Sequence, residues 1–335
     1  MLLNTNSKGA MQLLRMTEGL IIHQSLSAMA SLGIADLLRD GPRDISAVAD
    51  AAKVDEEALY RALRFLAGHG VFCETAPRQF ANSQLSHWLR SDVPDSVRRA
   101  VIFRGSPYFI SALTALSDVI ATGRPAHDAF ERLRRNPEEA CIFDDAMTDV
   151  SAIWAPIVAS AHDFGYWGSL MDVGGGNGLL LAAVLKAYPC LRAVLADQQH
   201  VLERAQNWAI WSDLKDRIAF EPIDFFQSVP ATCRAYLMKN VIHDWNDELA
   251  LKILRNCRRA VPDNGVLFLV EYSVGPANTP SLGKATDMIM LASTGGKERT
   301  VNEHRELLAA AGFQLRNVTP VEGDVMMLEA RPATS

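Results

Sequence analysis

The sequence has few cysteines, no excess of positive charge and no long apolar run. Its five cysteines lie far apart and form neither a Cys-x-x-Cys pair nor a Cys/His cluster with zinc spacing. No segment approaches the ~20 consecutive apolar residues that a membrane span requires. The first nine residues also lack the basic and then apolar pattern of a signal peptide. We therefore expect a cytoplasmic protein with reduced cysteines and no membrane partner.

The charge balance is mildly acidic, because 39 Asp and Glu residues outnumber 33 Lys and Arg residues and give a net charge of −6. Nucleic-acid binding depends on clustered basic side chains that release counterions from phosphates, so a nucleic-acid partner is not expected. With 335 residues, 49% of them hydrophobic, the chain is long enough for two domains. The composition favours an enzyme that acts on a small molecule.

The first 100 residues predict a helical domain. Residues 10–40 have a helical pattern with more apolar side chains than one domain can bury, which indicates contact with a second subunit. These side chains are Leu13, Leu14, Leu20, Ile21, Leu26, Met29, Leu32, Ile34 and Leu37. Residues 43–90 then predict a helix, a turn, a second helix and a hairpin, as in a winged-helix unit. We expect this region, 1–100, to form a dimerisation domain.

A winged-helix unit is also typical of transcription regulators, in which the second helix enters the DNA major groove. Here that helix begins with Asp55, Glu56 and Glu57 and carries only Arg61 and Arg64 as bases. Because phosphates repel such an acidic start, a structural role is favoured over DNA binding.

The remaining chain predicts a helical connector over 101–165, broken near residues 123–125, and an α/β domain over 166–335. Strands and helices alternate in this last domain, which is typical of a doubly wound, mainly parallel sheet. The expected strands are 169–173, 192–196, 217–222, 234–239, 265–271 and 324–331, and the expected helices are 179–188, 199–208, 247–261 and 302–311. Ligands bind at the carboxyl ends of such strands.

A glycine-rich turn follows the first of these strands. Asp172 and Val173 are followed by glycines at 174, 176 and 178, which permit positive φ angles and let backbone N–H groups approach a ligand. A dinucleotide fingerprint needs a third glycine at position 179, where this chain has Leu. The spacing, with an acid before it, instead suits a cofactor with adenosine and an amino-acid tail. S-adenosylmethionine fits best.

Two further acids end the neighbouring strands. Asp197 ends the second strand, where a carboxylate can accept hydrogen bonds from ribose hydroxyls, although capping a surface helix would also explain it. Asp224 ends the third strand and is followed by Phe225 and Phe226, which suits the amino edge and ring of adenine. Core packing would equally explain the two phenylalanines.

A histidine follows the fourth strand. Lone histidines are more often structural than catalytic, but His243 lies at a carboxyl end opposite the glycine turn and is followed by Asp244. An unperturbed imidazole takes up a proton near neutral pH, so His243 is the natural general base. Glu271, at the end of the next strand, and Glu298 can reach the same ring and orient it. A salt bridge with Arg299 is the alternative role for Glu298.

Together these segments resemble the plant-type and bacterial small-molecule O-methyltransferase family, which includes caffeic acid and hydroxyindole O-methyltransferases and antibiotic-tailoring enzymes. The resemblance covers nearly the whole chain. It involves residues 32–38 in the N-terminal domain, the turn 172–178, the segment His243-Asp244-Trp245 and the late loop 295–300.

The resemblance implies a winged-helix dimerisation domain, a Rossmann-like methyltransferase domain, and a homodimer whose N-terminal helices help to close the partner's site. It implies that His243 is the base, assisted by Glu271 and Glu298. Because the positive charge of the donor already activates its methyl group, we expect that no metal is needed. The residues expected to bind S-adenosylmethionine are Asp172, Gly174, Gly176, Asp197, Gln198, Asp224, Phe225 and Lys239. Those expected to line the acceptor pocket are Phe143, Met147, Trp154, Asp244, Met290 and Thr294, although such residues are more often simple core.

The segment 125–137 is shorter than in many relatives, and in the expected donor site the chain departs from the family pattern at two points. Asp197-Gln198-Gln199 stands where relatives have Asp-Leu-Pro, and Ile223-Asp224 stands where they have Gly-Asp. Both changes alter the wall around the adenosine.

The sequence thus predicts an O-methyltransferase acting on a phenolic hydroxyl of a small aromatic or polyketide-like molecule. Two alternatives stay open. One is methyl transfer to carbon or nitrogen, for which some relatives hold a metal with two histidines, whereas this chain has Glu298 in the late loop. The other is a protein of the same fold that binds the donor without transferring its methyl group.

Overall fold

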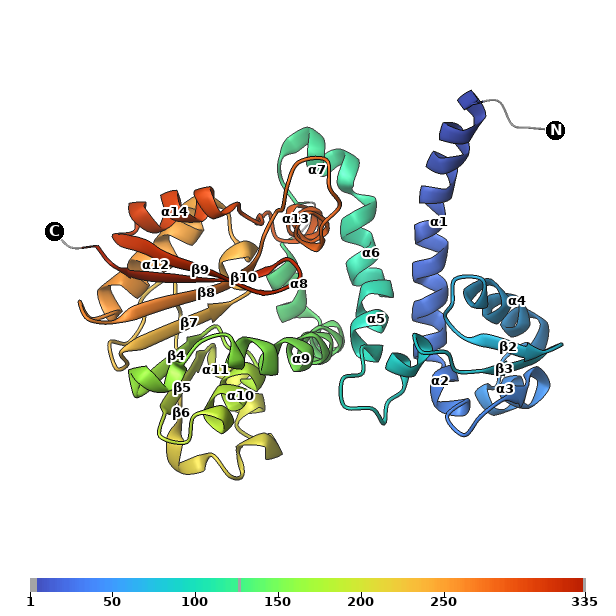
Figure 1. Ribbon diagram of the computed structural model, residues 1–335, viewed down its shortest axis with the longest axis horizontal. Helices are drawn as coiled ribbons and strands as arrows, with labels where there is room; N and C mark the ends of the chain where they lie inside the picture. Colours follow the sequence, from blue (N-terminus) through green and yellow to red (C-terminus); the bar gives the residue numbers. More distant parts are fainter. Residues whose placement is uncertain (1–4, 126–127, 334–335) are drawn as a thin grey trace. The chain divides into compact units, whose positions relative to one another are not determined.

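The computed structural model describes residues 5–125 and 128–333 and divides into two compact units (Figure 1). The first unit contains the residues up to Ile110 together with 138–150, and the second contains 111–137 and the residues from Ser151 onward. The predicted connector, 101–165, contributes to both units. No helix within the described ranges is both long and apolar enough to cross a membrane.

The first unit has the predicted winged-helix arrangement. Asp44 caps one helix by accepting a hydrogen bond from the Ser46 amide at 3.0 Å, and Asp55 caps the next from the Ala58 amide at 2.8 Å. Three short strands pair in the order β1-β3-β2. The elements are α1 (Thr5–Ser31), α2 (Ile34–Leu37), β1 (Arg43–Asp44), α3 (Ile45–Ala52), α4 (Glu56–Ala67), β2 (Cys73–Ala76), β3 (Gln79–Ala81) and α5 (Arg98–Gly105).

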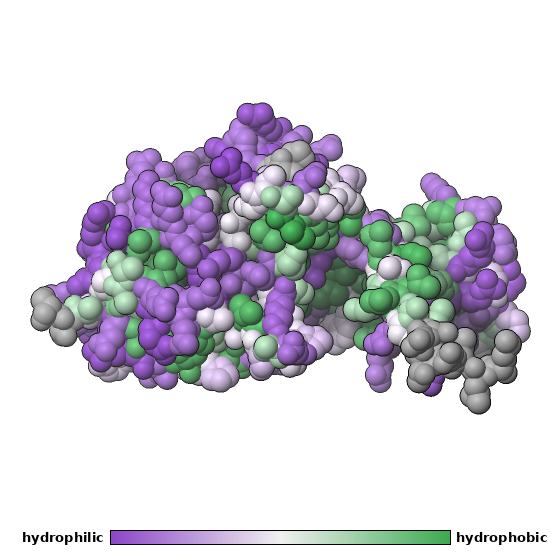
Figure 2. All heavy atoms as spheres, turned by 90° about the horizontal axis from the view of Figure 1, so that it is seen from above, coloured by the Kyte–Doolittle hydropathy of each residue, from purple (hydrophilic) through white to green (hydrophobic). Residues whose placement is uncertain are grey.

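The helical pattern over 10–40 is interrupted in the structure. Gly33 adopts a left-handed conformation with φ 67°, which ends the long helix and separates it from α2. Upstream of this break, α1 presents a row of exposed apolar side chains. Leu13, Leu14, Met16, Leu20 and Ile21 are each more than half exposed, and Figure 2 shows apolar surface at the right of the view, where the first unit lies.

The acids of α4 are already paired within the unit. Arg78, in the turn between β2 and β3, contacts Glu56 at 2.6 Å and Glu57 at 3.0 Å. This pairing occupies a basic side chain of the hairpin that a DNA-binding wing would direct at phosphate, so it agrees with the structural role predicted for the unit.

The second unit is built around a seven-stranded sheet with the order β6-β5-β4-β7-β8-β10-β9. The pairs from β6 to β8 are parallel, and β10 is antiparallel to both of its neighbours. This confirms the doubly wound, mainly parallel sheet. The strands are β4 (Ser169–Val173), β5 (Arg192–Asp197), β6 (Ile218–Pro222), β7 (Ala235–Lys239), β8 (Val266–Tyr272), β9 (Phe313–Glu322) and β10 (Val325–Pro332).

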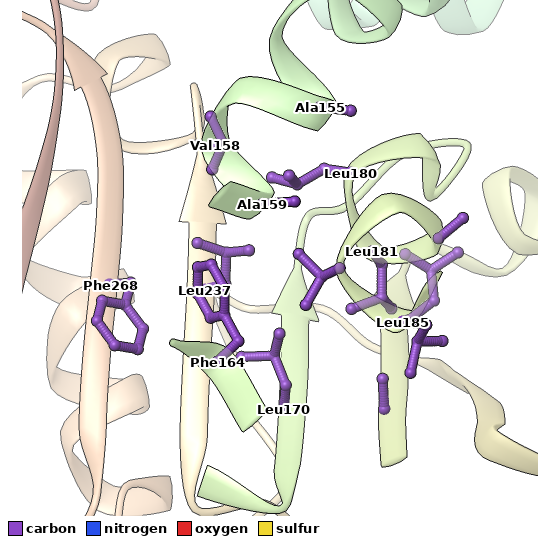
Figure 3. Close-up of a cluster of buried hydrophobic side chains, with 14 of the residues drawn as sticks. Ala155, Val158, Ala159, Phe164, Leu170, Leu180, Leu181, Leu185, Leu237 and Phe268 are labelled. Carbon is purple, nitrogen blue, oxygen red and sulfur yellow. The ribbon is translucent and has the colours of Figure 1, made fainter. Parts of the chain in front are cut away.

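Helices cover both faces of this sheet. The end of α9, α10 and α11 pack on one face, and α12 and α14 pack on the other. Figure 3 shows the first face, where Leu170, Leu237 and Phe268 from neighbouring strands meet helix residues such as Leu181. The remaining α-helices of the described chain, of which α6 and α9 span both units, are α6 (Pro107–Thr114), α7 (Leu116–Thr122), α8 (Ala129–Arg135), α9 (Pro137–Ser160), α10 (Leu179–Ala187), α11 (Gln199–Ala205), α12 (Asp247–Ala260), α13 (Leu282–Ser293) and α14 (Val301–Ala310).

The second unit contains an α-helix, α13, and a strand, β9, that were not predicted. α13 begins at the capping residue Ser281 and carries the two acceptor-pocket candidates Met290 and Thr294 at its end. β9 is an edge strand that contains Pro320 and alternates between polar and apolar residues. A proline within a segment argues against a central strand, although it is tolerated in a strand at the edge of a sheet. The proline therefore obscured the strand in the sequence.

Candidate active site

The glycine turn lies between β4 and α10, next to the point where the sheet order reverses from β4 to β7. Gly174, Gly176 and Gly178 have φ angles of 72°, 58° and 78°, so all three are left-handed, as predicted. A Cβ on Gly178 would lie 2.5 Å from the Trp211 ring, whereas a Cβ on Gly176 would meet no atom within 4 Å. Gly178 is therefore required for packing, and Gly176 borders open space.

Asp197, at the end of β5, fixes this turn from the neighbouring strand. One of its oxygens accepts a hydrogen bond from the Gly176 amide at 2.8 Å, and the other accepts from the Gln198 amide at 2.7 Å. Burial raises the pKa of Asp197, and the two amide bonds oppose that rise. Each carboxylate oxygen can accept more than one bond, so Asp197 keeps capacity for a ligand hydroxyl. The side chain of Gln198 is exposed.

Asp224 and Phe225 follow β6 on the same side of the sheet. The Asp224 carboxylate is exposed and accepts hydrogen bonds from the Phe226 amide and the Gln227 side chain, both at 2.9 Å. The Phe225 ring lies beside the glycine turn, because a Cβ on Gly174 would be 3.6 Å from it.

An aromatic cluster that the sequence did not reveal surrounds this ring. Trp245 packs edge-on against Phe225 and Phe226, and Phe130 of α8 stacks on Trp245 with ring centroids 5.4 Å apart. The Trp245 indole nitrogen is buried without a hydrogen-bond partner in the described chain. In the sequence, Trp245 could have been singled out only by its position directly after His243 and Asp244.

Asp172 and Lys239 are adjacent charged groups at the ends of β4 and β7. Burial raises the pKa of Asp172 to about 7, and the charge of Lys239 opposes this rise. Burial in turn lowers the pKa of Lys239, against the attraction of Asp172 and Glu271. Desolvation thus opposes the charged forms of both groups, and their mutual attraction favours those forms.

His243 lies in a short 3-10 turn, Ile242–Asp244, directly after β7, and is 7% exposed. Its Nδ1 is 2.7 Å from an oxygen of Glu298 and 3.8 Å from an oxygen of Glu271. The structure therefore brings together the three residues that the sequence assigned to catalysis. When the Glu298 carboxylate accepts the Nδ1 proton, Nε2 has a free lone pair.

The carboxyls around the ring are strongly desolvated. Burial raises the pKa of both Glu271 and Glu298, and the nearby Asp287 raises that of Glu298 further. Burial also raises the pKa of Asp244 to about 6; its oxygen lies 3.7 Å from Nε2. One oxygen of Glu271 accepts the Ile242 amide at 3.1 Å, while the other is buried without a partner in the described ranges. Burial thus disfavours the charged forms of these carboxyls. A carboxylate that is ionised beside the ring stabilises a positive imidazolium strongly, because the low dielectric strengthens their attraction.

The alternative role for Glu298, a salt bridge with Arg299, is not what the structure shows. Arg299 instead bonds Asp247 at 2.8 Å, and Glu298 is left to the histidine. Sequence reasoning also missed Asp287 of α13, which accepts the Glu298 amide at 2.9 Å. In the sequence, the only indication of a role for Asp287 was that an acidic residue stands within a mainly apolar segment.

The acceptor-pocket candidates are divided between the two units. Trp154, Asp244, Met290 and Thr294 lie in the second unit, and Phe143 and Met147 lie in the first. Trp154 packs edge-on against Tyr272, with ring centroids 6.4 Å apart. The Thr294 hydroxyl donates to the Met290 carbonyl at 3.2 Å and accepts from the Gly296 amide at 3.1 Å. That these six residues bind one acceptor stays a prediction.

Comparison with known proteins gives a consistent result. The sequence profile of an O-methyltransferase domain matches residues 116–314, and that of an O-methyltransferase dimerisation domain matches residues 14–92. The chain is 37% identical to phenazine O-methyltransferase PhzM of Lysobacter antibioticus over 96% of its length and 95% of that protein. It is 32% identical to a mitomycin biosynthesis 6-O-methyltransferase of Streptomyces lavendulae, over 92% and 91% of the two chains.

A solved structure adds information on ligands. The chain superimposes with a TM-score of 0.79 on the neocarzinostatin-biosynthesis O-methyltransferase NcsB1, at 28% identity over 92% of this chain and 95% of that one. That structure contains S-adenosylmethionine and 2-hydroxy-5-methyl naphthoic acid.

Proposed function

Because this chain belongs to the O-methyltransferase family, we propose that it transfers the methyl group of S-adenosylmethionine to a hydroxyl of a small aromatic molecule, with His243 as general base. The observation that carries this proposal is the geometry of one ring. The Nδ1 atom of His243 is held by Glu298 at 2.7 Å, so its Nε2 atom is available for a proton.

The proposed donor site is the glycine turn with its neighbouring acids. Gly176 borders open space, and its amide is held by Asp197. Backbone close to a ligand and a carboxylate at the next strand are the features that hold an adenosine in such sheets. Gly174, Asp224, Phe225 and Lys239 complete this proposed site, together with Asp172 and Gln198.

In the proposed reaction, Nε2 removes the proton of the acceptor hydroxyl as the oxygen attacks the sulfonium methyl carbon. The new C–O bond forms as the C–S bond breaks, and its electron pair returns to sulfur, which leaves S-adenosylhomocysteine. Glu298 and Glu271 stabilise the imidazolium that results. The protein supplies alignment to about 3–3.5 Å, a dry site and the base.

We propose that this reaction needs no metal, because the sulfonium charge already activates the methyl group. His243, Glu271 and Glu298 do have donor atoms that lie within 4.8 Å of one another, so the point requires a test. The acceptor class rests on relatives such as the phenazine O-methyltransferase and NcsB1, whose structure contains a naphthoic acid, and on apolar candidates such as Met290. We also propose that the protein acts as a homodimer, which agrees with its dimerisation domain. We propose the reducing cytoplasm as its location, which agrees with five cysteines that lie far apart in the sequence and form no Cys-x-x-Cys pair.

The proposal is tested by incubating the protein with methyl-labelled S-adenosylmethionine and a panel of phenolic acceptors. We expect the labelled methyl group to be bonded to the acceptor oxygen, with one equivalent of S-adenosylhomocysteine formed for each methyl group transferred. We expect the rate of transfer to be unchanged by EDTA. Label on carbon or nitrogen would support the alternative methyltransferase activity. Donor binding without label transfer would support the non-methylating alternative, and loss of the rate in EDTA would contradict the metal-free mechanism.

A further inference from the structure

Arg299 is a deeply buried cation of the second unit, with only 1% of its side chain exposed. It lies in the late loop between α13 and α14. Its guanidinium donates to an Asp247 carboxylate oxygen at 2.8 and 2.9 Å, and to the carbonyls of Ile242 at 3.1 Å, Trp245 at 2.8 Å and Lys297 at 3.3 Å. The charge is therefore fully hydrogen-bonded.

Two of these acceptors bracket the proposed base. Ile242 and Trp245 lie on either side of the turn that carries His243, and Asp247 begins the helix α12 that follows. A single planar guanidinium thus fixes both ends of the turn. Lysine, with its compact ammonium, cannot reproduce this fork of donors.

The adjacent residues of the late loop hold the same histidine. Glu298 bonds the His243 ring at 2.7 Å. Gly296 packs so closely that a Cβ there would lie 2.0 Å from the His243 carbonyl oxygen. The loop therefore contacts the ring through Glu298 and the backbone through Gly296 and Arg299.

We propose that Arg299 is a positioning residue for the methyl transfer, which holds the His243 turn so that Nε2 stays aligned with the acceptor oxygen. This inference rests on the proposed function. Such a residue affects the rate through the alignment of the reacting groups, because a displacement of about 1 Å in these groups can lower the rate by ~10²-fold. None of the hydrogen-bond partners of Arg299 belongs to the proposed donor site, so we expect donor binding to change little.

The test compares Arg299→Met with Lys297→Met as a matched control. Lys297 contacts the other oxygen of Asp247 at 3.3 Å and lies nearer to solvent. We expect Arg299→Met to lower kcat by ~10²-fold and to leave the Kd of S-adenosylhomocysteine within about twofold, while the control changes neither. Equal kcat values for Arg299→Met and wild type, or an equal loss in the control, would overturn the proposal.

Two further variants separate positioning from folding. Arg299→Lys and Asp247→Asn each retain part of the network, and we expect graded losses of kcat with folded proteins. Since Glu298 and Arg299 are proposed to hold one residue, the double change Glu298→Gln with Arg299→Met should cost much less than the product of the single losses. Fully multiplicative losses would contradict the shared role.

A readout independent of turnover distinguishes failure of this inference from failure of the proposed function. In protein with ¹⁵N-labelled histidine rings, the His243 Nδ1 proton bound to Glu298 should give a downfield resonance in wild type and in Lys297→Met. We expect it to be lost or broadened in Arg299→Met. An unchanged resonance in Arg299→Met contradicts the positioning role, whether or not an acceptor has been found.

Discussion

At the residue scale, the chemistry depends on which nitrogen of His243 is free. The contact with Glu298 occupies Nδ1, and the nearest charged group to Nε2 is Asp244 at 3.7 Å. Residue types and order along the chain were enough to predict this cluster, because His243 follows a strand, Glu271 lies near the end of one, and Glu298 follows a glycine pair. The contacts of Asp287 and Arg299 could not be predicted, since they depend on how α13 and the late loop fold back onto the turn.

Replacing His243 by Gln tests the base. The amide keeps a similar size but cannot accept a proton, so we expect kcat to fall by ~10²–10⁴-fold. The affinity for S-adenosylhomocysteine, measured by calorimetry, should stay nearly the same. The exposed His200→Gln serves as control. Wild-type turnover in His243→Gln would rule out general-base catalysis by this residue.

Two alanine substitutions in the glycine turn should have different effects. Gly178→Ala forces a Cβ to within 2.5 Å of Trp211 at φ 78°, and we expect a loss of about 3 kcal/mol of stability. Gly176→Ala meets no protein atom, so it should cost about 1 kcal/mol of stability but weaken donor binding more strongly. Thermal unfolding and calorimetry measure the two quantities. Unchanged donor affinity in Gly176→Ala would place the donor elsewhere.

At the element scale, the alternation of strands and helices predicted the central sheet well. Buried parallel strands such as Val266–Tyr272 consist of almost continuous apolar residues, which is a strong signal. The pattern failed for β9, which lies at the edge beside β10 and is largely solvent-exposed. It also failed for α13, whose boundaries depend on the Ser281 cap rather than on apolar periodicity.

The helix α14 contains a buried histidine, His304, that lowers the stability of the folded protein at acid pH. His304 is buried, and neither ring nitrogen has a partner within the described residues. Burial lowers its pKa to about 3. The folded pKa lies below the unfolded value near 6.5, so the stability tied to the neutral ring is present above pH 6.5 and is lost as pH falls.

We therefore expect the stability difference between wild type and His304→Leu to change with pH. Between pH 7.5 and pH 5 the wild type should lose about 2 kcal/mol relative to the variant. The comparison cancels the opposite contribution of carboxyls with raised pKa, such as Asp172, because both proteins contain them. Urea unfolding across this range measures the difference, and a gap that does not vary with pH would contradict the buried neutral state.

At the scale of the whole molecule, the apolar excess of the N-terminal helix predicted a need for a second subunit. The structure confirms the exposure: Leu13 is 67% exposed and Leu20 59%. The dimerisation profile over 14–92 covers the same helix. Which surface the apolar face of α1 packs against could not be derived from the sequence, because periodicity reveals an apolar face but not its partner.

Charges on this face should separate the subunits. We expect Leu13→Glu with Leu20→Glu to convert a dimer into a monomer, because each buried carboxylate would be unpaired in the interface. Gln12→Glu, also exposed on α1, adds charge without removing an apolar side chain and serves as control. Sedimentation velocity measures the mass. A monomeric wild type, or a dimer that persists in the double variant, would contradict the interface.

The central claim is that the glycine turn after Asp172 seats a sulfonium donor opposite His243. A crystal structure with S-adenosylhomocysteine and a phenolic acceptor tests it most directly. The account predicts the thioether ligand along residues 174–178 and the acceptor hydroxyl between its sulfur and Nε2, about 2.6–3.2 Å from that nitrogen. A ligand bound away from the turn, or a hydroxyl out of reach of Nε2, would contradict it.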